Sequence, residues 1–194
     1  MTLMLERLPE AIGHALRGAR PGAGKLVYND PATHGAVTDL DVSSPAFNDG
    51  DAIPARYTAD GQKVSPPLAW GRVPPLTAAI VIIIEDADSP TPQPLVHGIV
   101  WGLPGEDGQL PEGALRSPAS TGEPVPMGRN SYLSAQYLPP DPPPGHGPHR
   151  YAFQVFALQT LPQLSGAPGR RAIVEILREN VLAKGCLIGV YERR

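Results

Sequence analysis

Long apolar runs along the chain predict a domain built mainly of β-strands. Three of these runs, at residues 77–85, 95–103 and 151–158, are bounded by turn residues. The first two are apolar at successive positions, as in strands with both faces buried, so we expect them at the centre of a sheet. Shorter strands are predicted within residues 38–47 and up to Trp70. Because strands and helices do not alternate regularly, the predicted fold class is mainly β.

Apolar residues three and four positions apart predict a helix within residues 3–18. The stripe consists of Leu5, Leu8, Ile12 and Leu16. Pro9 is tolerated only in the first turn of a helix, so the regular part of this helix is expected to start near it. An isolated helix of this length is marginal in water. We therefore expect it to dock on the rest of the domain or across a homodimer interface.

A second helix is predicted over residues 170–184, near the C-terminus. Its apolar face would consist of Ile173, Ile176, Leu177 and Val181. Gly185 follows directly and is suited to end the helix. The apolar residues 186–191 then predict one more strand.

Proline and glycine interrupt the apolar pattern, with 25 and 21 copies in the 194 residues. They concentrate between residues 102 and 150, so this region is expected to form loops and turns packed around the strands. Long loops inside a compact domain are often functional.

Composition and charge argue against several classes of protein. The formal net charge is −3, whereas an extended nucleic-acid surface needs a basic patch. No apolar stretch approaches the ~20 residues of a membrane span, and no secretory leader pattern appears at the N-terminus. We therefore expect a soluble protein in the cytoplasm. The single cysteine, Cys186, cannot form an intramolecular disulfide and is expected to be a buried, inert thiol.

Polar residues stand at the ends of the predicted central strands. Asp86 and Asp88 follow the first of these strands and would share a side if the chain stays extended. His97 opens the next strand. His149 and Tyr151 are two positions apart at the start of the third strand and would face one way. The sequence therefore predicts a small polar pocket where these strand ends meet.

Each of these residues also has a structural explanation. Aspartate before Ser-Pro commonly forms a turn, which applies to Asp88. A histidine at the start of a strand is often a hydrogen-bonded core residue. Arg150 would point away from its two neighbours and is expected to form an ion pair that ties the loop down. Only the joint arrangement of the residues predicts a binding pocket.

Two segments carry a resemblance to a known family. One is "IIIEDADSPTPQPLVHGIVWGLP", an apolar strand followed by two acids and a downstream histidine; the other is "YLPPDPPPGHGPHRY". Supporting matches are "IPARYTADGQKVSPPLAWGRVP" and "VLAKGCLIGVYER". With these motifs the chain resembles the phosphatidylethanolamine-binding protein family, in its bacterial branch often called Raf-kinase-inhibitor-like. The resemblance covers residues 38–193, which divides the chain into an N-terminal helical extension with a connector, residues 1–37, and a family-like domain, residues 38–194.

The resemblance implies a fold and a pocket. The fold would be an antiparallel β-sandwich-like core with a C-terminal helix, to which this chain adds an N-terminal helix. The pocket would accept small anions such as phosphate head groups and needs no cofactor. Its residues would be Asp86, His97, His149 and Tyr151, with Asp88 and Pro143 on its wall. The carboxylates would repel an anion, so their expected role is to orient the histidine N–H groups.

Three functions fit these residues. The favoured function is the binding of a phosphate-bearing or other anionic small molecule, with regulation of a partner protein as an extension. A hydrolase is the alternative, since Asp86, His97 and His149 could supply acid–base chemistry. The chain has no G-x-S-x-G nucleophile motif. A metal site is the third reading, although no HExxH motif or closely spaced ligand pair supports it.

Overall fold

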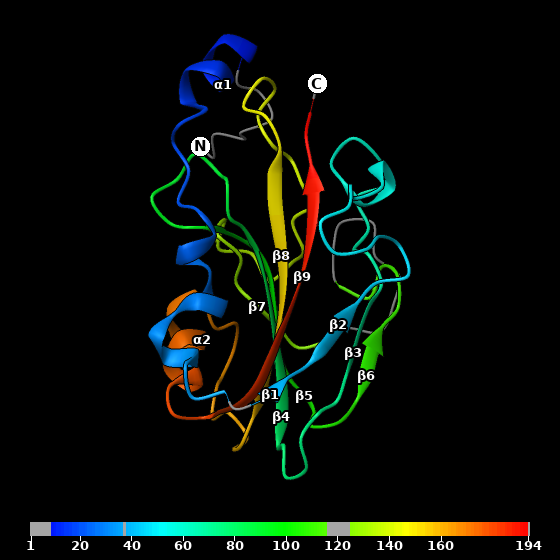
Figure 1. Ribbon diagram of the computed structural model, residues 1–194, viewed down its shortest axis with the longest axis vertical. Helices are drawn as coiled ribbons and strands as arrows, with labels where there is room; N and C mark the ends of the chain where they lie inside the picture. The colour runs from blue at the N-terminus through cyan, green and yellow to red at the C-terminus, as the bar shows by residue number, and fades with distance from the viewer. Residues whose placement is uncertain (1–8, 37, 116–124, 194) are drawn as a thin grey trace.

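The computed structural model describes residues 9–36, 38–115 and 125–193 of the chain. Two β-sheets form the domain (Figure 1). The larger sheet has the strand order β1-β9-β8-β4-β5-β7, and the smaller has the order β2-β3-β6. The strands of the larger sheet are β1 (Thr38–Asp39), β4 (Ala79–Asp86), β5 (Leu95–Pro104), β7 (Met127–Gly128), β8 (His149–Leu158) and β9 (Val181–Tyr191). Those of the smaller sheet are β2 (Asp41–Ser43), β3 (Leu68–Gly71) and β6 (Gly108–Leu110).

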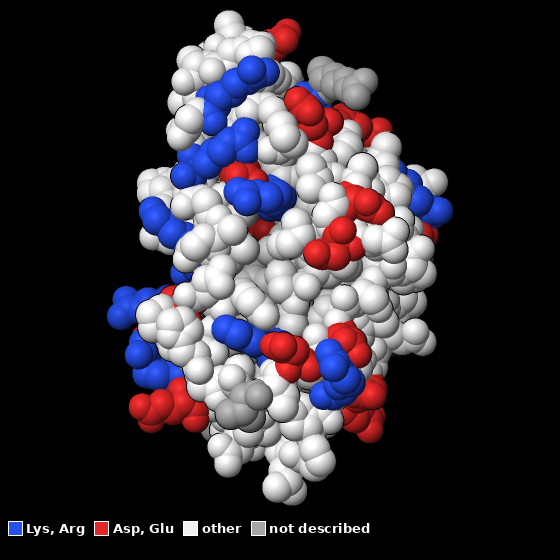
Figure 2. Space-filling model, in the orientation of Figure 1, with Lys and Arg blue, Asp and Glu red and all other residues white. Residues whose placement is uncertain are grey.

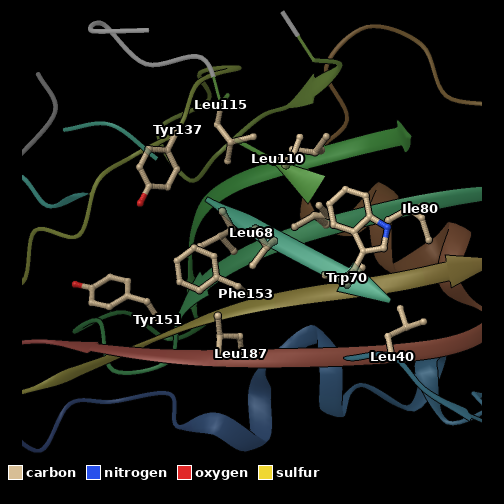
Figure 3. Packing of buried hydrophobic residues seen from close by; sticks show 14 of the residues in the cluster. Leu40, Leu68, Trp70, Ile80, Leu110, Leu115, Tyr137, Tyr151, Phe153 and Leu187 are labelled. Carbon is tan, nitrogen blue, oxygen red and sulfur yellow. The ribbon is translucent and has the colours of Figure 1, made fainter. Parts of the chain in front are cut away.

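Strand β4 lies at the centre of the larger sheet, between β5 and β8, and all of its residues are buried. Its alternate side chains enter two apolar clusters on opposite faces of the sheet. Ile80, Ile82 and Ile84 pack with Leu68 and Trp70 of the smaller sheet (Figure 3). The other face carries Val81 and Ile83 and packs against the helix α2, Arg170–Leu177. The mainly β sandwich and the central position of the doubly apolar strands are both confirmed.

The N-terminal helix is shorter than its apolar stripe predicted. The helix α1 spans Glu10–Leu16 and begins directly after Pro9, and residues 1–8, with Leu5 and Leu8, lie outside the described part of the chain. Ile12 is 42 % exposed, so this side chain does not anchor the helix. The buried position is Gly13, where a β-carbon would overlap the carbonyl oxygen of Pro144. The helix therefore docks on the domain by close backbone approach.

Three short 3₁₀ turns follow α1: η2 (Ala23–Lys25), η3 (Val27–Asn29) and η4 (Pro31–Thr33). A fourth, η5 (Ala55–Tyr57), lies between β2 and β3. The segment of η2 to η4, predicted to be a simple connector, is packed onto the α2 side of the larger sheet. Val27 is fully buried there, and its amide donates to the Glu85 carboxylate over 2.8 Å.

The prediction of a helix through residue 184 is wrong beyond residue 177. Helix α2 ends at Leu177, and β9 begins at Val181, so Gly185 lies inside a strand. From Val181 to Gly189 every second residue is buried, which is the period of a strand with one buried face. A β-carbon on Gly185 would lie 2.5 Å from the Leu40 carbonyl oxygen. This glycine therefore allows close packing between chain segments and does not end a helix.

Glu85 occupies a closed polar site on the α2 side of the sheet. Its side chain is fully buried and accepts hydrogen bonds from the Val27 amide (2.8 Å), Gln154 Nε2 (2.9 Å) and Arg170 Nε (2.7 Å). These partners belong to three separate segments: the N-terminal turns, β8 and α2. The single carboxylate thus connects three segments of the chain.

Candidate functional site

Three adjacent central strands bring polar residues to one end of the larger sheet. Asp86 is the last residue of β4 and pairs in register with Tyr151 on β8 and with Leu95 on β5. His97 lies two residues further along β5, and His149 is the first residue of β8. The candidate residues are therefore neighbours because their strands are neighbours.

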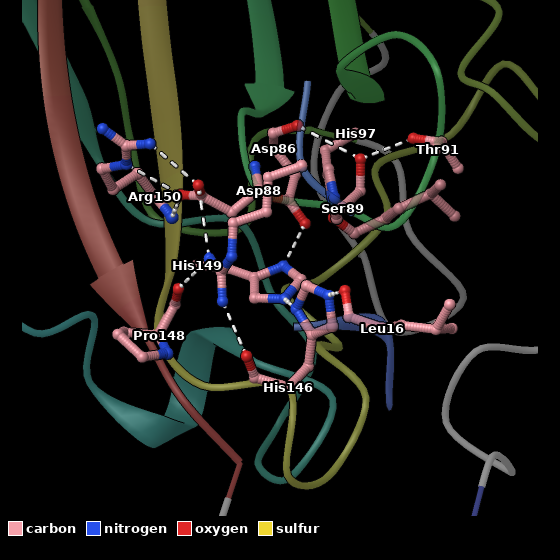
Figure 4. Close-up of polar contacts among 12 residues, drawn as sticks. Leu16, Asp86, Asp88, Ser89, Thr91, His97, His146, Pro148, His149 and Arg150 are labelled. Atoms are coloured by element: carbon pink, nitrogen blue, oxygen red, sulfur yellow. Dashed lines mark hydrogen bonds and ion pairs between the residues drawn. The ribbon is translucent and has the colours of Figure 1, made fainter. Parts of the chain in front are cut away.

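Asp86 begins a chain of hydrogen-bonded side chains (Figure 4). Its Oδ2 lies 2.7 Å from His149 Nδ1, and His149 Nε2 lies 2.7 Å from His146 Nδ1. His146 Nε2 lies 2.8 Å from the carbonyl oxygen of Leu16. His146 and His149 are both fully buried. Both ring nitrogens of His149 are thus occupied by protein groups, so this side chain supports the pocket and has no nitrogen left for a ligand.

His97 and Tyr151 each have one polar atom without a partner. His97 Nδ1 lies 2.9 Å from the Leu138 carbonyl oxygen, whereas its Nε2 and the Tyr151 hydroxyl are buried without a hydrogen bond. The two rings meet edge to face with their centroids 5.1 Å apart. Unsatisfied buried polar atoms are rare in proteins, and each calls for a specific explanation. Two of them side by side mark the place where a ligand or water would bind.

Burial sets the protonation of these groups. It lowers the pKa of His97, although the nearby Asp86 carboxylate acts in the opposite direction. It also raises the pKa of Tyr151 well above its usual value, with further contributions from Asp86 and Asp141. At neutral pH His97 is therefore an uncharged imidazole and Tyr151 a protonated phenol.

Asp88 is held by two arginines at the edge of the site. Arg150 donates to it from Nε and Nη2, each over 2.8 Å, and from its backbone amide over 2.9 Å. Arg20 Nη1 lies 3.3 Å from the same carboxylate. Burial alone would raise the pKa of Asp88, but these hydrogen bonds outweigh it and lower that pKa to about 2. The predicted ion pair of Arg150 is confirmed, and Figure 2 shows Lys and Arg side chains gathered on the side of the molecule that carries α1 and α2.

The N-terminal segment of residues 9–22, which we call the strap, is hydrogen-bonded to the loop before β8. Arg17 Nε donates to the Gly145 carbonyl oxygen over 2.7 Å. Arg20 donates to the carbonyl oxygens of His146 (2.6 Å) and Pro148 (2.7 Å). At its far end the strap donates the Gly22 amide to the Ala87 carbonyl oxygen over 2.9 Å. The strap therefore spans the two loops that border the site.

Comparison with known proteins settles the family. The family model described as "Phosphatidylethanolamine-binding protein" matches residues 43–192. The chain belongs to the phosphatidylethanolamine-binding protein family. A relative named UPF0098 protein from Aquifex aeolicus is 35% identical over 172 residues, covering 88% of this chain and 98% of the relative. Another UPF0098 protein, from Mycobacterium tuberculosis, is 37% identical over 158 residues, covering 79% of this chain and 70% of the relative.

Solved structures of family members share the fold. A putative phosphatidylethanolamine-binding protein homologue from Chlamydia trachomatis matches with a TM-score of 0.72 and 28% identity over 81% of this chain and 99% of its own. The E. coli protein YbcL, described as a new member of the mammalian family, matches with a TM-score of 0.72 and 27% identity over 81% of this chain and 100% of its own.

The structure places the predicted site residues in two groups. Asp86, His97, His149 and Tyr151 come together at the strand ends of this family member. Pro143 is buried in the preceding loop and accepts the His146 amide over 3.2 Å. Asp88, the other predicted wall residue, is directed to Arg150 and Arg20.

The sequence interpretation missed His146 and the strap. His146 stands three residues before His149 in "GHGPHR", and that spacing in a glycine-rich loop was the available signal. Arg20 and the Leu16 carbonyl carried no local signal, because their contacts lie 126 to 130 positions away in the sequence.

Other features of the described residues bear on the remaining predictions. No group of three or more His, Cys, Asp or Glu side chains in these residues has an arrangement suited to a metal ion. Within the same ranges no helix is long and apolar enough to cross a membrane. Cys186 is partly buried, and burial raises the pKa of its thiol to about 12. This thiol is therefore protonated at neutral pH and a poor nucleophile.

Proposed function

We propose that the pocket binds a small molecule through an anionic oxygen group, such as a phosphate. One observation carries the proposal: His97 Nε2 and the Tyr151 hydroxyl are buried without partners, on two rings whose centroids lie 5.1 Å apart. The Tyr151 hydroxyl would donate to the anion. Asp86 and His149 would not contact the anion. Their mutual hydrogen bond of 2.7 Å would hold the wall of the pocket in position.

Family membership supports this proposal. The names of the family and of the Chlamydia trachomatis structure refer to phosphatidylethanolamine binding. For this chain, binding of a head-group-like anion, regulation of a partner protein and a cytoplasmic location are parts of the proposal.

The hydrolase alternative is less well supported by the geometry. A general base needs a free nitrogen within reach of the substrate or of a water molecule. In His149 and His146 all ring nitrogens contact protein groups, so among the three histidines of the site only His97 offers a free nitrogen, its Nε2. Cys186, the one cysteine, has a raised pKa because of burial. We therefore favour a binding function.

Calorimetric titration with inorganic phosphate and phosphoethanolamine tests the proposal. In Tyr151→Phe the affinity should fall roughly 10- to 100-fold, because a hydrogen bond to a charged group contributes about 1.5–3 kcal/mol. Tyr57→Phe is the matched control, since it also removes one phenol hydroxyl, but one that already donates to Glu112 over 2.7 Å. Its affinity should equal that of the wild type. Unchanged binding in Tyr151→Phe would place the anion elsewhere.

A further inference from the structure

The donor and acceptor roles of the pocket side chains restrict the ligand further than a requirement for negative charge alone. We propose that the pocket selects an oxyanion that still carries a proton, such as a phosphate monoester in its monoanionic form. This inference rests on the proposed anion-binding function and adds the protonation state of the ligand to it.

The role of His97 follows from its other ring nitrogen. The Leu138 carbonyl oxygen can only accept, so the Nδ1 that lies 2.9 Å from it carries a hydrogen. A neutral imidazole has one N–H, and the unpartnered Nε2 is therefore a lone-pair acceptor. The neighbouring Tyr151 hydroxyl can donate one hydrogen bond. The site thus pairs one acceptor with one donor.

The surrounding charges favour a neutral His97. The ionisable groups that act on the His97–Tyr151 pair are Asp86, His149, Asp141 and Tyr137. Asp86 would favour an imidazolium, but its carboxylate is already engaged by His149 Nδ1 over 2.7 Å. Asp141 is likewise engaged by Arg193 over 2.5 Å. His97 is almost completely buried, at 4 % exposure, so the charged form would be poorly solvated.

A protonated oxyanion matches both groups at once. Its P–O–H can donate to His97 Nε2 while a neighbouring P–O⁻ accepts from the Tyr151 hydroxyl. Sulfate and phosphodiesters lack this proton at neutral pH, so their oxygen lone pairs would face the lone pair of Nε2. The same rule separates free phosphate monoesters from the diester phosphate of a lipid head group.

Methyl phosphate and dimethyl phosphate form a matched pair of probes. Both carry a single negative charge at about pH 5, below the second pKa of about 6 of a monoester, but only methyl phosphate has a P–O–H. We expect calorimetry to show methyl phosphate binding at least about tenfold more tightly than dimethyl phosphate or sulfate, as one hydrogen bond to a charged group implies. At about pH 8 the affinity for methyl phosphate should fall, because the monoester has then lost that proton.

The variant His97→Gln provides a second readout. Its side-chain amide can turn either an N–H or a carbonyl toward the ligand, so the preference for methyl phosphate over sulfate should shrink about tenfold. Equal wild-type affinities for methyl phosphate, dimethyl phosphate and sulfate would overturn the selection for a protonated anion. If Tyr151→Phe weakened all three affinities, the proposed anion site would still be supported. Absence of binding by all three probes would overturn the anion site itself.

A second, independent observation concerns the docking of the strap. The Asp86–His149–His146–Leu16 chain contains three hydrogen bonds, each of which needs one proton. Both ends of the chain, a carboxylate and a carbonyl, are acceptors. Two neutral imidazoles supply only two protons. We infer that the docked strap requires one additional proton on this cluster.

The position of that proton follows from burial. Burial, followed by the charge of His149, lowers the pKa of His146, which stays neutral and donates its Nε2–H to the Leu16 carbonyl. The hydrogen-bond count then leaves the additional proton between Asp86 and His149, whose side chains are 2.7 Å apart. When this proton leaves, the hydrogen of His146 must move from Nε2 to Nδ1 so that His146 can donate to His149. The Nε2 lone pair of His146 then faces the Leu16 carbonyl oxygen. Docking is therefore lost as pH rises, because the docked state binds more protons than the released state.

Other charged groups face the same contact and define the controls. The strap brings Arg17, Arg20, His14 and Glu10, and the loop after β4 brings Asp88. The arginines do not titrate in the neutral range, and the carboxylates titrate at acidic pH. His14 is the other histidine of the strap, and its Nε2 lies 3.3 Å from Glu10.

Hydrogen exchange of the Gly22 amide reports strap docking, because this amide donates to the Ala87 carbonyl. In the full-length wild type, the protection of the Gly22 amide is corrected for the intrinsic exchange rate. It should fall about tenfold as pH rises through the neutral range, which is the equivalent of one hydrogen bond. His14→Gln should retain this fall. His146→Phe should show weaker protection that no longer changes with pH. Constant wild-type protection across the range would overturn the inference, whether or not the Phe variant folds.

Discussion

At the scale of single residues, the Tyr151 hydroxyl is buried at a cost in stability. The buried Tyr151 hydroxyl has no partner, and an unsatisfied buried polar group costs about 1–3 kcal/mol. We therefore expect Tyr151→Phe to raise the free energy of unfolding by about 1 kcal/mol while it weakens phosphate binding. Chemical denaturation without added anion measures this. Tyr57→Phe should instead lower stability, since that hydroxyl donates to Glu112 over 2.7 Å. A loss of stability in both variants would contradict the idea.

Asp88 gives the molecule a defined sensitivity to acid. Its pKa is lowered from 3.8 to about 2 by Arg150 and Arg20, against the effect of burial. A carboxyl with a lowered folded-state pKa stabilises the fold above its unfolded pKa, and that contribution disappears as pH falls from about 4 to about 2. The loss should amount to about 2 kcal/mol, and Asp88→Asn should lack this part of the pH dependence. Unfolding curves at several acidic pH values would reveal it. Parallel curves for the two proteins would refute the assignment.

At the scale of elements, Gly13 decides how α1 docks. A β-carbon at position 13 would overlap the Pro144 carbonyl oxygen, whereas one at Gly18 would meet nothing within 4 Å. Gly13→Ala should therefore destabilise the protein by roughly 1–3 kcal/mol, which lowers Tm by about 2–4 °C per kcal/mol in a chain of this size. Gly18→Ala should leave Tm nearly unchanged. Equal melting temperatures for the two variants would mean that α1 does not dock through Gly13.

The elements also show where sequence reasoning reaches its limit. The strands β4, β5 and β8 were predictable because most of their residues are buried and apolar. Residues 178–184 were misread because Val181 lies four positions after Leu177 and so continues the helical stripe. Only the pairing of this segment with β8 decides between helix and strand. The strap was predicted to use an apolar stripe, yet it uses backbone contacts and arginines, which leave no periodic pattern.

The candidate site could likewise be predicted only in part from the sequence. His97, His149 and Tyr151 were predictable from their positions at strand ends. Which nitrogen of each histidine is occupied depends on carbonyl groups of Leu138 and Leu16, and main-chain carbonyls leave no mark in a sequence. The chemical role of the pocket is therefore set by atoms that side-chain identity does not describe.

At the scale of the whole molecule, Glu85 connects the sheet to its covering layer. Its carboxylate is fully buried and binds Arg170 Nε over 2.7 Å. Removing one partner of a buried ion pair costs about 3–5 kcal/mol, so Arg170→Met should lower the free energy of unfolding by that amount. The control is Arg178→Met, because Arg178 pairs over 3.8 Å with the mostly exposed Glu175 and should cost no more than about 1 kcal/mol. Similar losses in both variants would show that Glu85 does not depend on this arginine.

The contact between the strap and the loop before β8 also dictates an order of events during synthesis. Leu16 and His146 are 130 positions apart, and a ribosome that adds 5–20 residues per second needs roughly 10 s to cover that distance. Over this interval the strap has emerged while its docking site does not yet exist. The strands β4, β5, β8 and β9 must assemble before His146 and Pro148 take their positions. The strap is therefore made before its docking site but reaches its place after it.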